Sequence, residues 1–153
     1  MSVHFAHTIV VPQTPDEVFA TLDDFSVTPQ WLERCTGIEK SVPGPNAEGQ
    51  ALRYAYRDGG RSGVMDGRII VRKPGERLAC VYEDRTMRVN VDFRIEAREG
   101  GARLTHTVDI APKTWFARLF SPMIRRSLPT QTVRAMERLR DYLRRTYAPA
   151  AGK

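Results

Sequence analysis

A strict alternation of apolar and polar side chains over residues 87–96 is the feature that most constrains the fold of this chain. A period of two is typical of a β-strand that has one dry face and one solvated face. The same period occurs over residues 3–11 and 104–110. Turn-forming residues divide residues 38–112 at intervals of roughly 8 to 15 residues. The pattern predicts one N-terminal strand and six later strands, and short turns of this kind join antiparallel neighbours.

Helical signals lie between the first two strands and again after the last one. Thr14, followed by a proline, is a typical N-cap, and a second short helix is expected around Trp31. Residues 122–146 carry apolar side chains three and four positions apart, which is the spacing of one buried helix face. Ser121 is expected to cap this helix, and Pro129, which lacks a backbone N–H, is expected to kink it. The apolar stripe consists of Leu128, Thr132, Met136, Leu139 and Leu143.

Length and composition indicate an ordinary soluble domain. The chain has 153 residues, of which 41% are hydrophobic and 27% charged. No apolar run approaches the roughly 20 residues needed to span a bilayer, and no secretory leader opens the sequence, so we expect a cytoplasmic protein. Cys35 and Cys80 have no metal-binding spacing and are expected to be reduced, packed thiols. We expect residues 1–147 to form one domain and residues 148–153 to be a disordered tail.

The positive charge is concentrated towards the end of the chain. Residues 1–112 contain 14 basic and 16 acidic side chains, whereas residues 113–153 contain 10 basic and 2 acidic ones. The basic face of the long helix is expected either to be solvated or to meet an anionic membrane surface. Nucleic acid is not the expected partner, because the second helix is too short to read DNA and carries only Arg34 as a basic residue.

The order of strand, two short helices, six strands and long helix resembles the helix-grip fold of the START-like (SRPBCC) superfamily, of the polyketide cyclase/dehydrase and lipid transport type. The motifs that carry the resemblance are residues 7–12 running into Pro15-Asp-Glu-Val-Phe19, then Trp31, Lys73-Pro-Gly-Glu-Arg-Leu78 and Arg103-Leu-Thr105. The resemblance implies an α+β protein in which a seven-stranded antiparallel sheet wraps around the C-terminal helix and leaves an internal apolar cavity. It implies little about chemistry, because proteins of one fold differ in the lining of their pockets.

Strand parity indicates which side chains would line such a cavity. Ligand pockets are typically mostly apolar, with a few polar groups that fix the orientation of the ligand. The alternative is that these side chains pack against one another and leave no void. The predicted lining residues are Trp31, Tyr54, Tyr56, Met65, Ile69, Cys80, Tyr82, Met87, Val89, Val91, Phe93, His106, Met136 and Leu139.

Two histidines are the expected proton-handling groups near neutral pH. If the first and last strands pair antiparallel with residue numbers that sum to 113, His7 lies directly opposite His106. Each imidazole would then disfavour protonation of the other, and the pair could orient a ligand carbonyl or act as acid and base. With Tyr82 they are the candidate catalytic residues, and simple burial beside hydroxyls or water is the alternative. No nucleophile elbow, phosphate loop, dinucleotide fingerprint or metal-ligand spacing occurs, so we expect no cofactor and no metal.

A second candidate site precedes the long helix. Its aromatic and leucine side chains are flanked by Arg118, Arg125 and Arg126. This composition suits either a lid over the mouth of the cavity or a segment that lies in a membrane interface. The residues predicted to form it are Trp115, Phe116, Leu119 and Phe120.

These observations favour binding over catalysis. We expect the chain to hold a small hydrophobic or aromatic molecule, such as a lipid, a quinone or a polyketide-like compound, and to be a monomer or a homodimer. A polyketide aromatase/cyclase is the first alternative, and a lipid or quinone chaperone that docks on a membrane through its basic C-terminal helix is the second. A module that binds RNA through the arginine stripe is a further alternative, which predicts strong salt dependence of binding.

Overall fold

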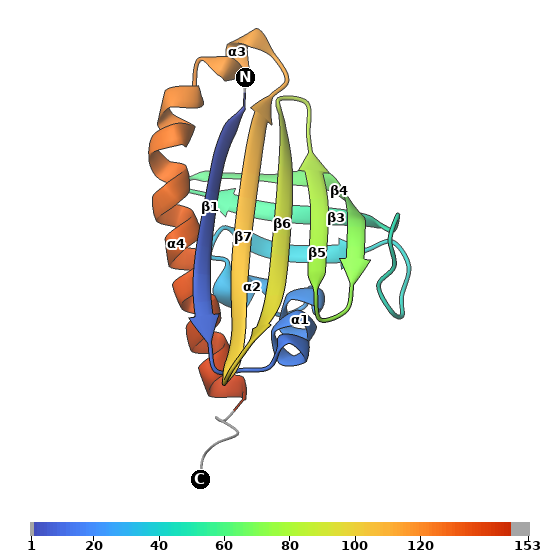
Figure 1. Ribbon diagram of the computed structural model, residues 1–153. Coiled ribbons are helices and arrows are strands. Elements are labelled where there is room, and N and C mark those ends of the chain that lie inside the picture. Colours follow the sequence, from blue (N-terminus) through green and yellow to red (C-terminus); the bar gives the residue numbers. More distant parts are fainter. Residues whose placement is uncertain (1, 148–153) are drawn as a thin grey trace.

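The computed structural model describes residues 2–147 and contains the predicted seven-stranded antiparallel sheet (Figure 1). The strand order is β1-β7-β6-β5-β4-β3-β2, so the first strand pairs with the last and every other pair is sequential. The predicted tail, residues 148–153, lies outside the described residues. The elements in chain order are β1 (Val3–Val11), α1 (Pro15–Asp23), α2 (Thr28–Trp31), β2 (Cys35–Lys40), β3 (Ala51–Asp58), β4 (Arg61–Lys73), β5 (Arg77–Glu83), β6 (Met87–Arg98), β7 (Gly101–Pro112), α3 (Trp115–Arg118) and α4 (Ser121–Thr146).

The long helix α4 extends along one side of a strongly curved sheet. In Figure 1, α4 runs beside β1, while β2, β3 and β4 cross behind β1, β7 and β6. α1 and α3 lie towards opposite ends of the molecule. This is the helix-grip arrangement that the order of elements predicted, and we call the sheet face turned towards α4 the inner face.

The predicted apolar stripe of α4 is buried against the inner face. Leu128 and Thr132 are buried, and Met136, Leu139 and Leu143 have no exposed surface at all. Burying one leucine or methionine side chain contributes roughly 1.5–3 kcal/mol. The stripe therefore anchors α4 to the sheet.

The two predicted helix caps differ in outcome. At α1 the capping box is complete, because Glu17 N donates to Thr14 Oγ1 at 3.1 Å and Thr14 N donates to Glu17 Oε1 at 3.0 Å. At α4 the prediction was wrong: Ser121 is the first helical residue, and the N-cap position belongs to Phe120, which makes no side-chain cap. Pro129 lies inside α4, which runs unbroken to its C-terminal end.

A β-bulge in β4 changes which side chains face inwards. Ile69 pairs with Cys80, but Val71 pairs with Ala79, the very next partner on β5. Simple alternation would place Val71 on the inner face with Ile69, but the bulge adds one residue to β4 and turns Val71 to the other face. The same shift turns Arg72 to the inner face.

The inward-turned Arg72 ties β4 to α1. Its Nε and Nη2 donate to the two carboxylate oxygens of Asp23 at 3.1 and 2.8 Å, and its guanidinium lies 5.5 Å from the ring centroid of Phe19. Burial alone would raise the pKa of Asp23, but hydrogen bonds from Arg72 and Asn46 hold it below its ordinary value. The carboxylate therefore stays ionised in a half-buried position.

Candidate functional site

The side chains between the inner face and α4 differ in how far they are buried. At the far end of the interior, Ile9, Ile95 and Leu104 are buried. Nearer to α3, Val3 and Val108 are buried, but several other apolar inner-face residues are only half-buried. They include Phe5, Val89, Val91 and Ile110, with Ile124 from α4. Alternation could have found Phe5 and Ile110, but the predicted lining did not include them.

The predicted lining residues come together on the inner face and on α4. Nine of the fourteen are buried: Trp31, Met65, Ile69, Cys80, Tyr82, Phe93, His106, Met136 and Leu139. The other five are half-buried: Tyr54, Tyr56, Met87, Val89 and Val91. Twelve of them, all but Met87 and His106, belong to one hydrophobic cluster or pack against it. Their role in holding a ligand stays a prediction.

The predicted pairing of the two histidines is confirmed, because His7 stands directly opposite His106 in the β1–β7 register. His106 is only 5% exposed, and its ring stacks on Phe93 with 4.3 Å between centroids and 12° between planes. Burial lowers the pKa of His106 to about 3, an effect that the charge of Asp92 opposes and that His7 reinforces. The imidazole of His106 is therefore neutral at physiological pH.

Three buried nitrogen atoms around Phe93 have no hydrogen-bond partner among residues 2–147. Two of them are Nδ1 and Nε2 of His106, and the third is Nε1 of Trp31. The Trp31 ring meets Phe93 edge to face, with 6.0 Å between centroids. Buried polar atoms are nearly always paired in folded proteins, and leaving one unpaired costs about 1–3 kcal/mol. These atoms can pair with a polar group that comes from outside the chain.

Three tyrosines form a second polar group on the inner face. The ring centroids of Tyr54 and Tyr82 are 4.8 Å apart, and those of Tyr54 and Tyr56 are 6.4 Å apart. Burial, reinforced by the neighbouring thiols, raises the pKa of Tyr54 and of Tyr82. Cys35 and Cys80 are free and buried, as predicted, and burial raises their pKa to about 11 and about 12 respectively. All four groups are protonated near neutral pH.

Two glycines of β4 make room for tyrosine rings. Gly67 pairs with Tyr82, and a Cβ atom at Gly67 would lie 2.4 Å from the Cδ1 atom of that ring. A Cβ atom at Gly63 would lie 2.6 Å from the hydroxyl of Tyr56. Each ring can therefore approach the backbone of β4, which is a common reason for glycine in a strand. The signal was present in the sequence as two glycines at alternate inner positions of one strand, but the predicted lining omitted them.

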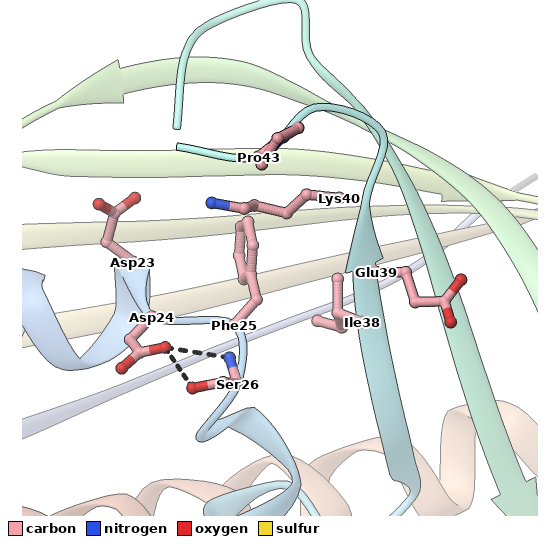
Figure 2. A pocket seen from close by; sticks show the side chains of 8 residues that line it. All are labelled: Asp23, Asp24, Phe25, Ser26, Ile38, Glu39, Lys40 and Pro43. Carbon is pink, nitrogen blue, oxygen red and sulfur yellow. Dashed lines mark hydrogen bonds between the residues drawn. The ribbon is translucent and has the colours of Figure 1, made fainter. Parts of the chain in front are cut away.

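The pocket in Figure 2 lies away from the predicted lining. In it, Ser26 N and Oγ donate to Asp24 Oδ1 at 3.1 and 2.6 Å, so these polar groups satisfy one another within a turn. Its volume is about 540 Å³, and it is lined by Asp23, Asp24, Phe25, Ser26, Ile38, Glu39, Lys40 and Pro43. A second pocket, of about 440 Å³, is lined by Pro129, Thr130, Val133, Arg134 and Glu137. Neither pocket includes a predicted lining residue, so the internal cavity stays a prediction.

The predicted lid residues lie at the surface. Trp115, Phe116, Leu119 and Phe120 are between 46% and 73% exposed. The lid role stays a prediction. Met123, which is 65% exposed, extends the same surface and was missed by the sequence prediction.

Several basic side chains of α4 meet acidic groups. Arg134 donates to Glu33 at 3.3 Å, and Arg138 lies 3.6 Å from the second carboxylate oxygen of Glu33. Arg144 donates to Asp141 at 2.6 Å. Part of the positive charge in the middle and at the end of α4 is thus compensated within the protein.

Around His106 and the three tyrosines, the chemistry on offer is hydrogen bonding by uncharged groups. A histidine with a pKa of about 3 is a weak base near neutral pH, and a tyrosine with a raised pKa is a weak acid. The catalytic roles of His7, His106 and Tyr82 stay predictions. Within residues 2–147, the structure groups no three metal-binding side chains, and no helix is long and apolar enough to cross a bilayer.

The sequence matches a known family over most of its length. Residues 2–144 match the model of the family described as polyketide cyclase / dehydrase and lipid transport. An uncharacterized protein of Mycobacterium tuberculosis is 29% identical over 108 residues, which cover 68% of this chain and 63% of that protein. The chain therefore spans less than two thirds of the length of this curated relative.

Solved structures share the fold at low sequence identity. A START superfamily protein from Mycobacterium smegmatis superposes with a TM-score of 0.79 and 15% identity, covering 94% of this chain and 99% of that one. The Zhui aromatase/cyclase from Streptomyces sp. R1128 superposes with a TM-score of 0.80 and 16% identity, covering 99% of both chains. At these identities the likeness concerns the fold alone. The match of residues 2–144 leads to one conclusion: this chain belongs to the polyketide cyclase / dehydrase and lipid transport family.

Proposed function

We propose that this chain binds a small hydrophobic or aromatic molecule between the inner face of the sheet and α4. Family and fold support hydrophobic ligand binding in general. The half-buried apolar residues towards α3, such as Phe5 and Val89, support entry from that end. Lipids, quinones and polyketide-like compounds all have the apolar body that such an interior would accept.

The observation that carries this proposal is the set of three unpaired nitrogens around Phe93. A neutral imidazole offers one donor and one acceptor, and the indole of Trp31 offers one more donor. A hydroxyl or phenol on the ligand could both accept and donate, and it would satisfy more of these atoms than an ether or an ester. We therefore infer that the ligand carries at least one such group, which His106 and Trp31 recognise.

A polyketide aromatase/cyclase is the second candidate. It is supported by the inward position of His106 and of the tyrosine cluster, since both could contact a bound polyketide-like chain. The neutral state of His106 and the raised pKa of Tyr82 favour binding over proton transfer, because neither group exchanges a proton readily near pH 7. Binding therefore ranks first.

The test compares two probes that differ by one hydroxyl. We expect the wild-type protein to bind 1-naphthol roughly five- to tenfold more tightly than naphthalene, since a neutral hydrogen bond contributes about 1 kcal/mol. His106→Leu keeps the apolar bulk, removes both ring nitrogens and should abolish this preference. Val64→Ser, an exposed position on the outer face of the sheet, is the matched control and should leave it intact.

Two results would reject the proposed recognition. One is an equal affinity of the wild-type protein for both probes, and the other is an unchanged preference in His106→Leu. Native mass spectrometry of the purified protein gives an independent reading. A co-purifying small molecule that is present in the wild type and lost in His106→Leu would support the proposal and identify the ligand class.

A further inference from the structure

Five large apolar side chains protrude at the end of the molecule where α3 lies. We call Trp115, Phe116, Leu119, Phe120 and Met123 the aromatic tip. Each of them is at least 46% exposed. Figure 1 shows α3 and the start of α4 at one end of the molecule, away from α1. Single exposed apolar residues are ordinary in soluble proteins, but a contiguous group of this size marks an interaction site.

The aromatic tip is a preformed cluster. Ala117 N donates to Thr114 Oγ1 at 3.0 Å, which caps α3, and the small residues Ala117 and Ser121 are the buried ones. The five large side chains are exposed, and the three aromatic rings among them contact one another. The rings of Trp115 and Phe116 are 5.6 Å apart at 76°, and those of Phe116 and Phe120 are 6.4 Å apart at 90°. The surface therefore needs no rearrangement to meet a partner.

The charge around the aromatic tip is positive. The sequence has no acidic residue between Asp109 and Glu137, while Arg118, Arg125 and Arg126 are exposed within that stretch. Segments that bind the interface of anionic bilayers combine aromatic side chains with basic ones, and tryptophan is enriched at the interface between membrane and water. Each basic residue near such a surface adds to the attraction.

We propose that the aromatic tip inserts into the interface of an anionic phospholipid bilayer, with the neighbouring arginines on the lipid phosphates. α3 has only four residues, so this is peripheral docking. A second copy of the chain fits less well, because a symmetric contact through the aromatic tip would bring the arginines of both copies together. The proposal concerns a surface outside the interior, and it holds whether or not the interior binds a ligand.

The experiment is flotation with vesicles of phosphatidylcholine alone and of phosphatidylcholine with phosphatidylglycerol. We expect the wild-type protein to float with the anionic vesicles. The double variant Trp115→Ser/Phe116→Ser should partition onto them at least about tenfold more weakly, because it loses the apolar area that the two rings would bury in the bilayer. Val64→Ser/Ile70→Ser removes two similarly exposed apolar side chains from the outer face and should float like the wild type. Arg118→Glu/Arg126→Glu should lose the preference for anionic lipid.

The two tryptophans give a direct reading of insertion. Trp115 is exposed and Trp31 is buried, so brominated lipids should quench the emission of Trp115 in the wild type and leave Trp115→Phe unquenched. Circular dichroism confirms that each variant is folded, and the 1-naphthol titration separates a failure of docking from a failure of ligand binding. Absence of the wild type from the anionic vesicle fraction would overturn the proposal. So would an equal loss in the outer-face control, or a wild-type dimer that Trp115→Ser/Phe116→Ser converts to a monomer.

Discussion

The substitution His106→Leu tests whether this histidine is buried as a neutral group. The leucine side chain has a similar volume and no polar atoms, so the variant removes two unpaired nitrogens at about 1–3 kcal/mol each. It also loses the stacking contact with Phe93, which contributes about 0.5–1.5 kcal/mol. We expect the variant to be at least as stable as the wild type at pH 7.5, although a buried native residue has been replaced.

A more specific test is how the difference in stability between His106→Leu and the wild type changes with pH. The pKa of His106 falls from 6.5 in the unfolded chain to about 3 in the folded protein. As the pH drops below 6.5, the unfolded chain binds a proton that the folded protein does not bind, so stability is lost between pH 6.5 and pH 3. Between pH 7.5 and pH 5 this linkage removes about 2 kcal/mol from the wild-type free energy of unfolding. The same figure results for any folded-state pKa below about 4.

The assay is urea unfolding of the wild type and of His106→Leu, followed by circular dichroism at several pH values from 7.5 to 5. The stability difference should grow by about 2 kcal/mol in favour of the variant as the pH falls. Val64→Ser, an exposed substitution on the outer face that changes no titratable group, is the control, and its stability difference from the wild type should not vary with pH. A difference that stays constant with pH would refute the reasoning, because His106 would then accept a proton in the folded protein.

Three further predictions concern packing, an ion pair and thiol reactivity. Gly67→Ala should destabilise the protein by about 1–3 kcal/mol, since the new methyl group would clash with Tyr82, and the additional change Tyr82→Leu should restore part of the loss in the same unfolding assay. Arg72→Met should lower stability at pH 7 by about 1–3 kcal/mol, because Asp23 would lose its charged partner. That loss should shrink below pH 4 as Asp23 is protonated, and a loss that does not depend on pH would contradict the assigned role. Because burial raises the pKa of Cys35 to about 11, the native protein should not react with a thiol reagent at pH 8 within minutes, whereas the urea-unfolded protein should, and rapid labelling of the native state would contradict this.

Strand alternation predicts the fold and one contact of the candidate site. The resemblance to the helix-grip fold implied that the first and last strands pair, and the period of two with matched apolar residues then placed His7 opposite His106. The apolar stripe of α4 predicted which helix face is buried. The inner and outer faces of the strands and the buried face of α4 follow from local periodicity, which the sequence shows directly.

Features that depend on a local irregularity or on long-range packing could not be predicted in this way. The bulge in β4 reverses the parity after Ile69, so Arg72 faces inwards although simple alternation placed Val71 there. Which residues of α3 are buried depends on how the helix packs on the rest of the protein, so composition alone did not show that Trp115 is exposed and Ala117 buried. That the three nitrogens lack partners can be recognised only in the structure, where Trp31, Phe93 and His106 lie together.

The pairing of the first strand with the last also has a consequence for how the domain folds. The hydroxyls of Thr8 and Thr105 lie 3.0 Å apart across β1 and β7, yet the two residues are 97 positions apart in the sequence. Chains emerge from the ribosome at roughly 5–20 residues per second, so β1 waits for several seconds before its partner strand exists. Contacts between such distant residues also slow folding, because the loop between them must close first. We therefore expect β1 to pair with β7 late in folding, and the His106 side chain to stay exposed to water until that pairing forms.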